Sequence, residues 1–120
     1  MNIEEHRARA GRIERSLAKC APDDFEMKIE GAMLAGTHWL NAVLHRLAIT
    51  KPENDVFHTY LLTVNEFRRL SVADDSLINA LAEIEDMRPA FVRGNFPGGH
   101  HAAQRALELL TLIRSKGNKE

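Results

Sequence analysis

The sequence predicts an all-α protein and, more specifically, an antiparallel four-helix up-down bundle with an additional peripheral N-terminal helix. Apolar residues recur every three or four positions through most of the chain, which is the spacing of one helix face. No alternating apolar and polar run bounded by turn residues indicates a strand. Short connections favour antiparallel neighbours. With 120 residues, the chain predicts one domain, a peripheral helix over 1–20 and a bundle core over 23–116.

The first two helices are separated by a proline. Residues 2–19 hold few large apolar side chains and several arginines, so this helix is expected on the outside. Pro22 and the acidic residues after it suit a first helical turn, which predicts a second helix over about 23–49. The residues expected to face the core are Phe25, Ile29, Ala32, Gly36, Leu40, Val43 and Leu47.

Three further helices follow from the same spacing. Asn54 or Asp55 is expected to cap a third helix that ends near Leu70, and Asp74 begins a fourth. Pro89 interrupts the fourth helix, because its ring displaces a backbone hydrogen bond, and a fifth runs over about 100–115. The residues expected inward are Phe57, Leu61, Val64 and Phe67 in the third helix, Leu77, Leu81, Ile84, Met87 and Phe91 in the fourth, and Ala102 or Ala103, Ala106, Leu110 and Ile113 in the fifth.

Composition excludes several classes of function. Sixteen basic and seventeen acidic residues give a net charge of −1, so there is no strong DNA-binding signal. The longest apolar stretch is interrupted by polar residues such as His38 and Arg46, so no membrane span is expected. A lone Cys20 and the absence of an N-terminal leader pattern predict a cytoplasmic protein. No motif indicates a cofactor.

The segment 88–101 is the first candidate binding site. It combines two guanidinium groups, a glycine-rich turn and two imidazoles at a helix start, a pattern that fits a phosphate or carboxylate. The alternative is a tight turn with surface histidines and arginines that pair with acidic neighbours. The candidate binding residues are Arg88, Arg93, Asn95, His100 and His101.

A second candidate is the polar face of the second helix. His38, Asn41 and His45 share this face and, with His58, are expected to line a cleft or a dimer seam. Seven residues separate the two helix histidines, which places their Cα atoms about 10 Å apart, too far to hold one ion easily. No zinc or di-iron spacing occurs, so no metal ligand is predicted. Hydrogen-bonded histidines at a helix boundary are the alternative.

The order of these features resembles the HEPN superfamily of α-helical bundles over about residues 25–114. The resemblance lies in the small-residue helix with His-Trp at 30–40, the arginine-containing end of the fourth helix and the alanine- and leucine-rich last helix. It implies either an RNase with an Arg and a His four to six residues apart across a dimer cleft, or a non-catalytic relative that accompanies nucleotidyltransferases. Arg93 and His100 are separated by six residues. Gly94 replaces the usual polar residue after the arginine.

The leading hypothesis is therefore a HEPN-like binding or accessory module that forms a homodimer and binds a nucleotide, RNA or a protein partner. The first alternative is a metal-independent RNase, in which His100 moves a proton and Arg93 stabilises phosphate charge. The second alternative is a purely structural interaction protein whose histidine face forms the dimer seam.

Overall fold

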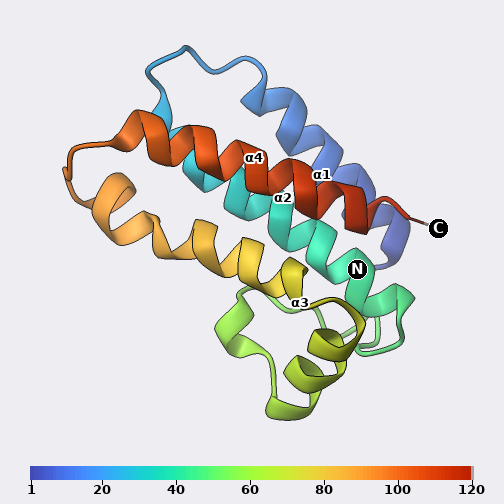
Figure 1. The fold of residues 1–120 in the computed structure, drawn as a ribbon. Helices are drawn as coiled ribbons and strands as arrows, with labels where there is room; N and C mark the ends of the chain where they lie inside the picture. Colours follow the sequence, from blue (N-terminus) through green and yellow to red (C-terminus); the bar gives the residue numbers. More distant parts are fainter. Residues whose placement is uncertain (120) are drawn as a thin grey trace.

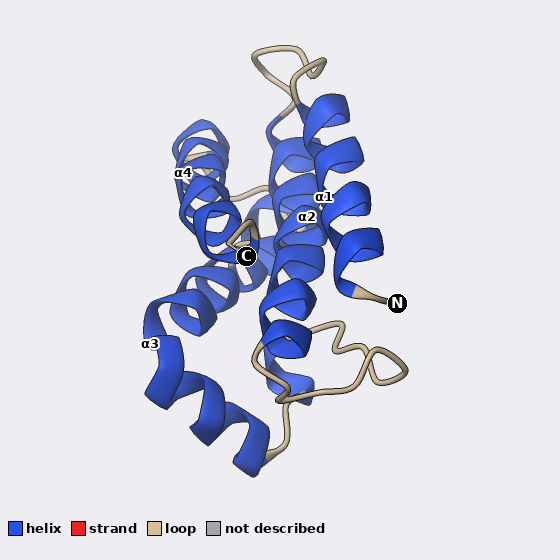
Figure 2. Cartoon of the chain, turned by 90° about the vertical axis from the view of Figure 1, so that its right-hand side faces the viewer, coloured by secondary structure: helices blue, strands red, loops and turns tan. Residues whose placement is uncertain are grey.

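The computed structural model describes residues 1–119, and over these residues the regular structure is helical throughout, with no strand (Figures 1 and 2). The all-α prediction is confirmed. The elements are α1 (Ile3–Leu17), α2 (Phe25–Arg46), the short 3-10 turn η1 (Thr59–Leu61), α3 (Val64–Asp86), the π-helical turn η2 (Arg88–Arg93) and α4 (Gly99–Gly117).

Helix α2 is the centre of the molecule. It packs most extensively against α4 and α1, while the second half of α3 lies against α4 and α2. Small residues make these close approaches possible: a Cβ on Gly31 would lie 2.3 Å from Leu17 Cδ2, and one on Gly36 would lie 3.0 Å from Leu81 Cδ1. Most of the predicted core stripes of α2, α3 and α4 are buried, including Ile29, Ala32, Leu40, Val43, Leu77, Leu81, Ile84, Ala106, Leu110 and Ile113.

Helix α1 begins with a capping box. The Asn2 side chain accepts a hydrogen bond from the Glu5 N–H, and the Glu5 carboxylate accepts one from the Asn2 N–H. This helix, predicted to be peripheral, lies along α2 (Figure 2) and buries His6 and Ala10. A histidine therefore enters the interior on the face of α1 that meets α2.

The predicted third helix is wrong in its first half. Residues 54–63 form turns, an extended stretch and η1, and α3 begins at Val64. The capping box of Thr63 and Glu66 sets this start, with the Glu66 N–H donating to Thr63 Oγ1 at 3.1 Å. The four residues expected inward, Phe57, Leu61, Val64 and Phe67, are instead 64%, 54%, 77% and 47% exposed.

The predicted break at Asp74 is a kink inside α3. Asp74 has extended backbone angles (φ −167°, ψ 94°), and its carboxylate accepts hydrogen bonds from Ser76 Oγ and from the Leu77 N–H. The predicted interruption at Pro89 is also observed, because α3 ends at Asp86 and η2 follows. Among the described helices, none is long and apolar enough to cross a lipid bilayer.

Candidate metal centre

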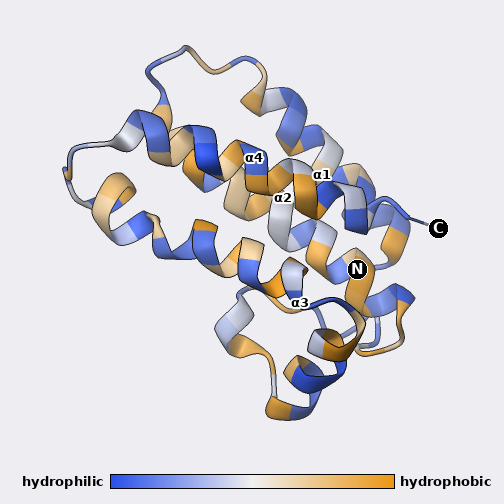
Figure 3. Cartoon of the chain, in the orientation of Figure 1, coloured by the Kyte–Doolittle hydropathy of each residue, from blue (hydrophilic) through white to orange (hydrophobic). Residues whose placement is uncertain are grey.

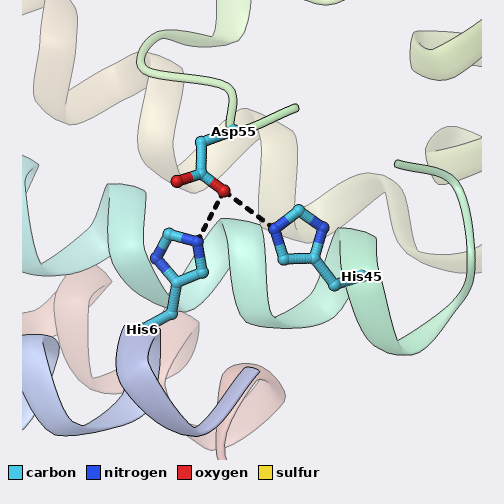
Figure 4. A group of neighbouring side chains, drawn as sticks. All are labelled: His6, His45 and Asp55. Carbon is cyan, nitrogen blue, oxygen red and sulfur yellow. Dashed lines mark hydrogen bonds and ion pairs between the residues drawn. The ribbon is translucent and has the colours of Figure 1, made fainter. Parts of the chain in front are cut away.

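Two buried histidines converge on one aspartate where α1 and the end of α2 meet the segment that follows α2 (Figure 4). His6 comes from α1, His45 from the last turn of α2 and Asp55 from the connection between α2 and η1. His6 Nε2 lies 2.8 Å from Asp55 Oδ1, and His45 Nε2 lies 2.9 Å from the same oxygen. The side chains of His6 and His45 are 2% and 1% exposed, so both imidazoles are shielded from water, while the Asp55 side chain is 17% exposed.

The second nitrogen of each imidazole also has a partner. His6 Nδ1 lies 3.0 Å from His38 Nδ1, and His45 Nδ1 lies 2.8 Å from Thr50 Oγ1. Metal-bound histidines in proteins characteristically hold one ring nitrogen on such a partner while the other nitrogen faces the ion. In both histidines the nitrogen directed at Asp55 is Nε2, so the two rings are oriented alike.

The chain reversal after α2 brings Thr50 back to His45. Ala48 adopts the left-handed region at φ 56°, and the Ile49 N–H donates to the Leu44 carbonyl at 2.9 Å, which is the pattern of a Schellman helix end. The Thr50 side chain thereby lies beside the His45 ring. A non-glycine residue at this position carries some backbone strain, which the hydrogen bonds of the reversal offset.

Asn41 fixes the position of Asp55. Its Nδ2 donates to the Val56 carbonyl at 2.6 Å and to the Thr37 carbonyl at 2.9 Å, while its Oδ1 accepts from the Val56 N–H at 2.7 Å. Asn41 is 1% exposed, so these bonds form without competition from water. The amide thus anchors the residue next to Asp55 onto α2.

The electrostatics of the cluster favour neutral histidines beside an ionised aspartate. Burial, together with smaller effects of the neighbouring His6 and Arg9, lowers the pKa of His38 to about 4. Burial also lowers the pKa of His6, against the opposing effect of Asp55. Burial alone would raise the pKa of Asp55, but hydrogen bonds from His6 and His45 outweigh it and lower that pKa. The terminal ammonium of Met1, 3.3 Å from Asp55 Oδ2, adds to this effect.

The hydrogen bonds determine which ring nitrogen of each histidine carries the proton. An ionised Asp55 can only accept, so His6 and His45 both donate from Nε2. His6 Nδ1 then carries a lone pair and accepts from His38 Nδ1–H. In this arrangement, each ring nitrogen of His6 has a hydrogen-bond partner: Nε2 donates to Asp55, and Nδ1 accepts from His38.

A cavity of about 350 Å³ opens beside the cluster. His6 and Asp55 form part of its wall, together with His38 and Asn41 from α2. Apolar side chains complete the lining, namely Met33, Leu34 and Phe57, and His58, Glu30 and Arg88 contribute polar groups. The cluster is therefore buried on the helix side and accessible from the cavity side.

The structure brings together most of the predicted histidine face. His38, Asn41 and His58 line the cavity, and His45 lies behind it on Asp55. Asn41 and His45 are buried within the chain. His58 Nδ1 lies 3.3 Å from Glu85 Oε2, outside hydrogen-bond geometry, and both atoms are buried without a hydrogen-bond partner among the described residues.

The predicted anion site is divided between separate places. Arg88 donates from Nε to Glu30 Oε1 at 2.6 Å and lines the cavity beside the cluster. His100 and His101 line a different, shallow pocket with Lys28. The remaining candidates, Arg93 and Asn95, are exposed on η2 and the turn after it. Arg88 thus lines one pocket, and the two histidines line another.

Three ligand atoms of the cluster fit the donor set of a transition-metal ion. His6 Nε2, His45 Nε2 and Asp55 Oδ1 all lie within 4.8 Å of one another. Zinc binds imidazole nitrogen and carboxylate oxygen at about 2.0–2.2 Å, so neighbouring tetrahedral ligands stand about 3.3 Å apart. The observed nitrogen–oxygen separations of 2.8 and 2.9 Å need to widen by about half an ångström to admit an ion.

Sequence reasoning missed His6 and Asp55 as functional residues. One signal for His6 was present, because it lies four residues before the buried Ala10 and therefore shares its helix face. Asp55 carries no such signal, since its position depends on the chain reversal and on Asn41. The sequence argument against a metal site considered only ligands three or four residues apart on one helix. The residues that lie beside His45 are His6 on α1 and Asp55 in the segment after α2, so that rule does not apply to them.

Comparisons of this chain with models of known protein families, with curated proteins and with solved structures found no match.

Proposed function

We propose that this protein is a helical binding module for a divalent transition-metal ion of the zinc class, held by His6, His45 and Asp55. The observation that carries the proposal is the convergence of two buried imidazole Nε2 atoms on one carboxylate oxygen, at 2.8 and 2.9 Å. The Nδ1 atom of each imidazole also lies beside a hydrogen-bond partner, His38 for His6 and Thr50 for His45. Each partner can accept a hydrogen bond from Nδ1 once Nε2 binds the ion.

The donor set selects the kind of ion. Imidazole nitrogen suits zinc, copper, nickel and iron, whereas magnesium and calcium prefer sites made of oxygen alone. Three protein ligands leave a fourth tetrahedral position, as in zinc sites that accept water or a small ligand. Because His6 and Asp55 line the cavity, the fourth position is proposed to face it.

Metal binding also moves protons within the network. An ion on Nε2 displaces the hydrogen bonds to Asp55, so His6 and His45 must carry their proton on Nδ1 instead. His45 then donates to Thr50, and His6 donates to His38 Nδ1. The proton of His38 consequently moves to its Nε2 atom. Both protonation patterns satisfy the cluster, which allows the site to exist empty and filled.

The test is a titration of chelator-treated protein with Co²⁺, followed by visible absorption, and with Zn²⁺, followed by calorimetry. We expect one ion per chain, with the absorption of tetrahedral Co²⁺. His6→Ala, His45→Ala and Asp55→Asn should each weaken binding at least 100-fold, provided that circular dichroism shows the variant to be folded. The matched control is His100→Ala combined with His101→Ala, which removes two exposed histidines and should leave binding unchanged.

Two results would contradict the proposal. The first is that wild-type protein, folded and free of chelator, binds no stoichiometric Co²⁺ or Zn²⁺. The second is that binding survives in folded Asp55→Asn and is lost in the His100 and His101 control. In either case the cluster would be a hydrogen-bonded structural network that joins α1, α2 and the 47–58 segment.

The HEPN-like assignment and the RNase alternative remain predictions. An RNase built on Arg93 and His100 requires both side chains to act on one phosphate, and among the described residues His100 shares its pocket with Lys28 and His101 and not with Arg93. An assay of chelator-treated protein on mixed RNA, beside Arg93→Ala and His100→Ala, tests this alternative. Metal-independent cleavage that both variants lose would establish it.

A further inference from the structure

The segment from Phe57 to Ala73 forms an arm that projects from the body of the molecule. It begins beside α2, where Phe57 and His58 line the cavity next to the histidine cluster. It continues through η1 into the first half of α3, which extends away from α1, α2 and α4 (Figures 1 and 2). The kink at Asp74 marks where α3 changes direction and joins the core. Hydrophobic residues are visible on this outlying part of the chain (Figure 3).

The arm exposes an unusual amount of apolar surface. Its exposed large hydrophobic residues, with their exposed fractions, are Phe57 (64%), Tyr60 (74%), Leu61 (54%), Val64 (77%), Phe67 (47%) and Val72 (86%). Three of the six are aromatic and present about 150–250 Å² each when fully exposed. With smaller areas for leucine and valine, the exposed areas of the six residues sum to about 700 Å². The largest apolar patch on a typical monomer is about 300–600 Å². That figure refers to one contiguous patch, whereas the 700 Å² is a sum over residues of one short segment. So much exposed apolar surface within one segment is typical of an interaction surface.

Little within the chain covers the helical half of the arm. Between Val64 and Ala73, Leu70 is the one buried residue among these described positions. At 100° per residue, Val64, Phe67 and Val72 lie within about 140° of the helix circumference. Val64 and Val72 lie on the side away from the buried Leu70, and Phe67 lies at the edge between the exposed and the buried side. The capping box of Thr63 and Glu66 and the buried Leu70 stabilise this helix of about ten residues only weakly, because isolated helices of this length are marginally stable in water.

We infer that this arm is the contact surface between two copies of the chain, in a symmetric dimer. The inference is independent of the metal site. A two-fold dimer uses the same patch on both partners, so each exposed apolar arm covers the other. The exposed area of about 700 Å² is close to the roughly 800 Å² that each partner contributes to a standard-size interface.

The charges of the arm also favour a second copy over a strongly charged partner. The exposed Arg68 and Arg69 lie beside Glu66, and the exposed Asp75 follows the kink. A segment that carries both signs can pair with itself, whereas a nucleic-acid surface requires a basic excess. The net charge of −1 adds no long-range repulsion between copies.

The proposed surface differs from the histidine seam considered from the sequence. His45 and Asn41 are buried by the protein's own chain, while Val64 and Val72 are among its most exposed apolar residues. A dimer through the arm therefore leaves the cluster of His6, His45 and Asp55 intact in each copy. The two features adjoin at Phe57, which lines the cavity beside the cluster, while Val64 and Val72 lie on the helical half of the arm.

Sedimentation equilibrium of the whole chain, in chelator and over a concentration series, tests this inference. We expect a monomer–dimer equilibrium for the wild type. Val72→Asp and Phe67→Asp each place a charge in both halves of the contact, and each should weaken the dimer at least 100-fold while circular dichroism shows an unchanged helical content. The matched control is Met27→Asp, at a 61% exposed position on α2, which should dimerise like the wild type.

Hydrogen exchange supplies a second measurement that does not depend on a variant. Amide protection over 64–73 should increase with protein concentration, because the partner copy covers this half of α3, while protection in α4 should stay constant. A wild type that remains monomeric at several hundred micromolar would overturn the inference. So would a dimer that persists in both arm variants, because the contact would then lie elsewhere on the molecule.

Discussion

Asn41 and Val56 are joined by two hydrogen bonds, although fifteen residues separate them in the sequence. The side-chain amide of Asn41 pairs with both backbone groups of Val56, much as a neighbouring strand would. Asp55 is thereby held against His6 and His45 at the start of a segment with no regular structure of its own. One buried amide on α2 thus determines where the third member of the cluster lies.

Replacing Asn41 should affect both stability and metal binding. Asn41→Ala leaves the buried N–H and carbonyl of Val56 without partners, and we expect a loss of about 2–4 kcal/mol in the free energy of unfolding. Zinc affinity should fall about 10- to 100-fold although Asn41 donates no ligand, because the position of Asp55 is no longer fixed. Urea denaturation and calorimetry measure the two effects. Asn65→Ala, at an exposed position, is the control and should change neither.

The histidines predict a loss of stability in mild acid. The pKa of His38 is about 4 in the folded protein and 6.5 ordinarily, so between these values the unfolded chain binds more protons. Stability is therefore complete above pH 6.5 and decreases as the pH falls towards 4. With allowance for the partial exposure of the ring, the loss is on the order of 2 kcal/mol. The lowered pKa of His6 acts in the same direction.

Urea denaturation at pH 7, 5.5 and 4.5 measures this dependence. His38→Gln should flatten it, since glutamine does not titrate. An unfolding free energy that is constant over this range would show that these imidazoles do not control stability. An equally steep decrease in His38→Gln would show that His38 is not the group responsible. The lowered pKa of Asp55 affects stability only below its ordinary value of 3.8, so the two effects occur in separate pH ranges.

Zinc should change the tautomers of three histidines. In the empty protein the hydrogen bonds place the proton of His6 and His45 on Nε2 and that of His38 on Nδ1. With zinc bound, nitrogen-15 NMR of the imidazoles should show the proton of His6 and His45 on Nδ1 and that of His38 on Nε2. Unchanged nitrogen shifts for His38 would mean that it is not coupled to the ion, and shifts at His100 would indicate binding elsewhere.

Substitution of alanine for glycine should have opposite effects on stability at Gly117 and at Gly11. A Cβ on Gly117 would lie 2.8 Å from Trp39 Cβ and 3.0 Å from the Trp39 carbonyl oxygen, so Gly117→Ala should destabilise the protein by about 1–3 kcal/mol. Gly11 lies inside α1 with its nearest neighbour, Arg15 Nη1, at 3.7 Å. Gly11→Ala should stabilise by about 0.5–1 kcal/mol, because alanine is the better helix former. Thermal denaturation of both variants should give shifts of opposite sign.

The fold could be predicted from the sequence where burial and periodicity agree. Helices α2 and α4 carry continuous apolar stripes, and these positions are buried. The segment around Phe57 and Val64 carries the same spacing without being buried, so periodicity alone indicated a helix where the chain forms a loop. The capping box of Thr63 and Glu66 was the better guide to where α3 begins.

The candidate site could be predicted only in part. The grouping of His38, Asn41 and His45 on one face of α2 follows from helix geometry, and His38 and Asn41 line the cavity. The partners of His45 come from α1 and from an irregular segment, and only tertiary packing brings these together. The position of Asp55 depends on the hydrogen bonds of Asn41 to Val56 and on the chain reversal at Ala48. No sequence pattern indicates either of these contacts.

Anomalous X-ray scattering at the zinc edge, from crystals of the zinc-loaded protein, is the most direct measurement of the central claim. A single peak about 2.0–2.2 Å from His6 Nε2, His45 Nε2 and Asp55 Oδ1 is the predicted result. A peak at His100 and His101, or no peak between the two buried histidines in protein that holds stoichiometric zinc, would contradict it.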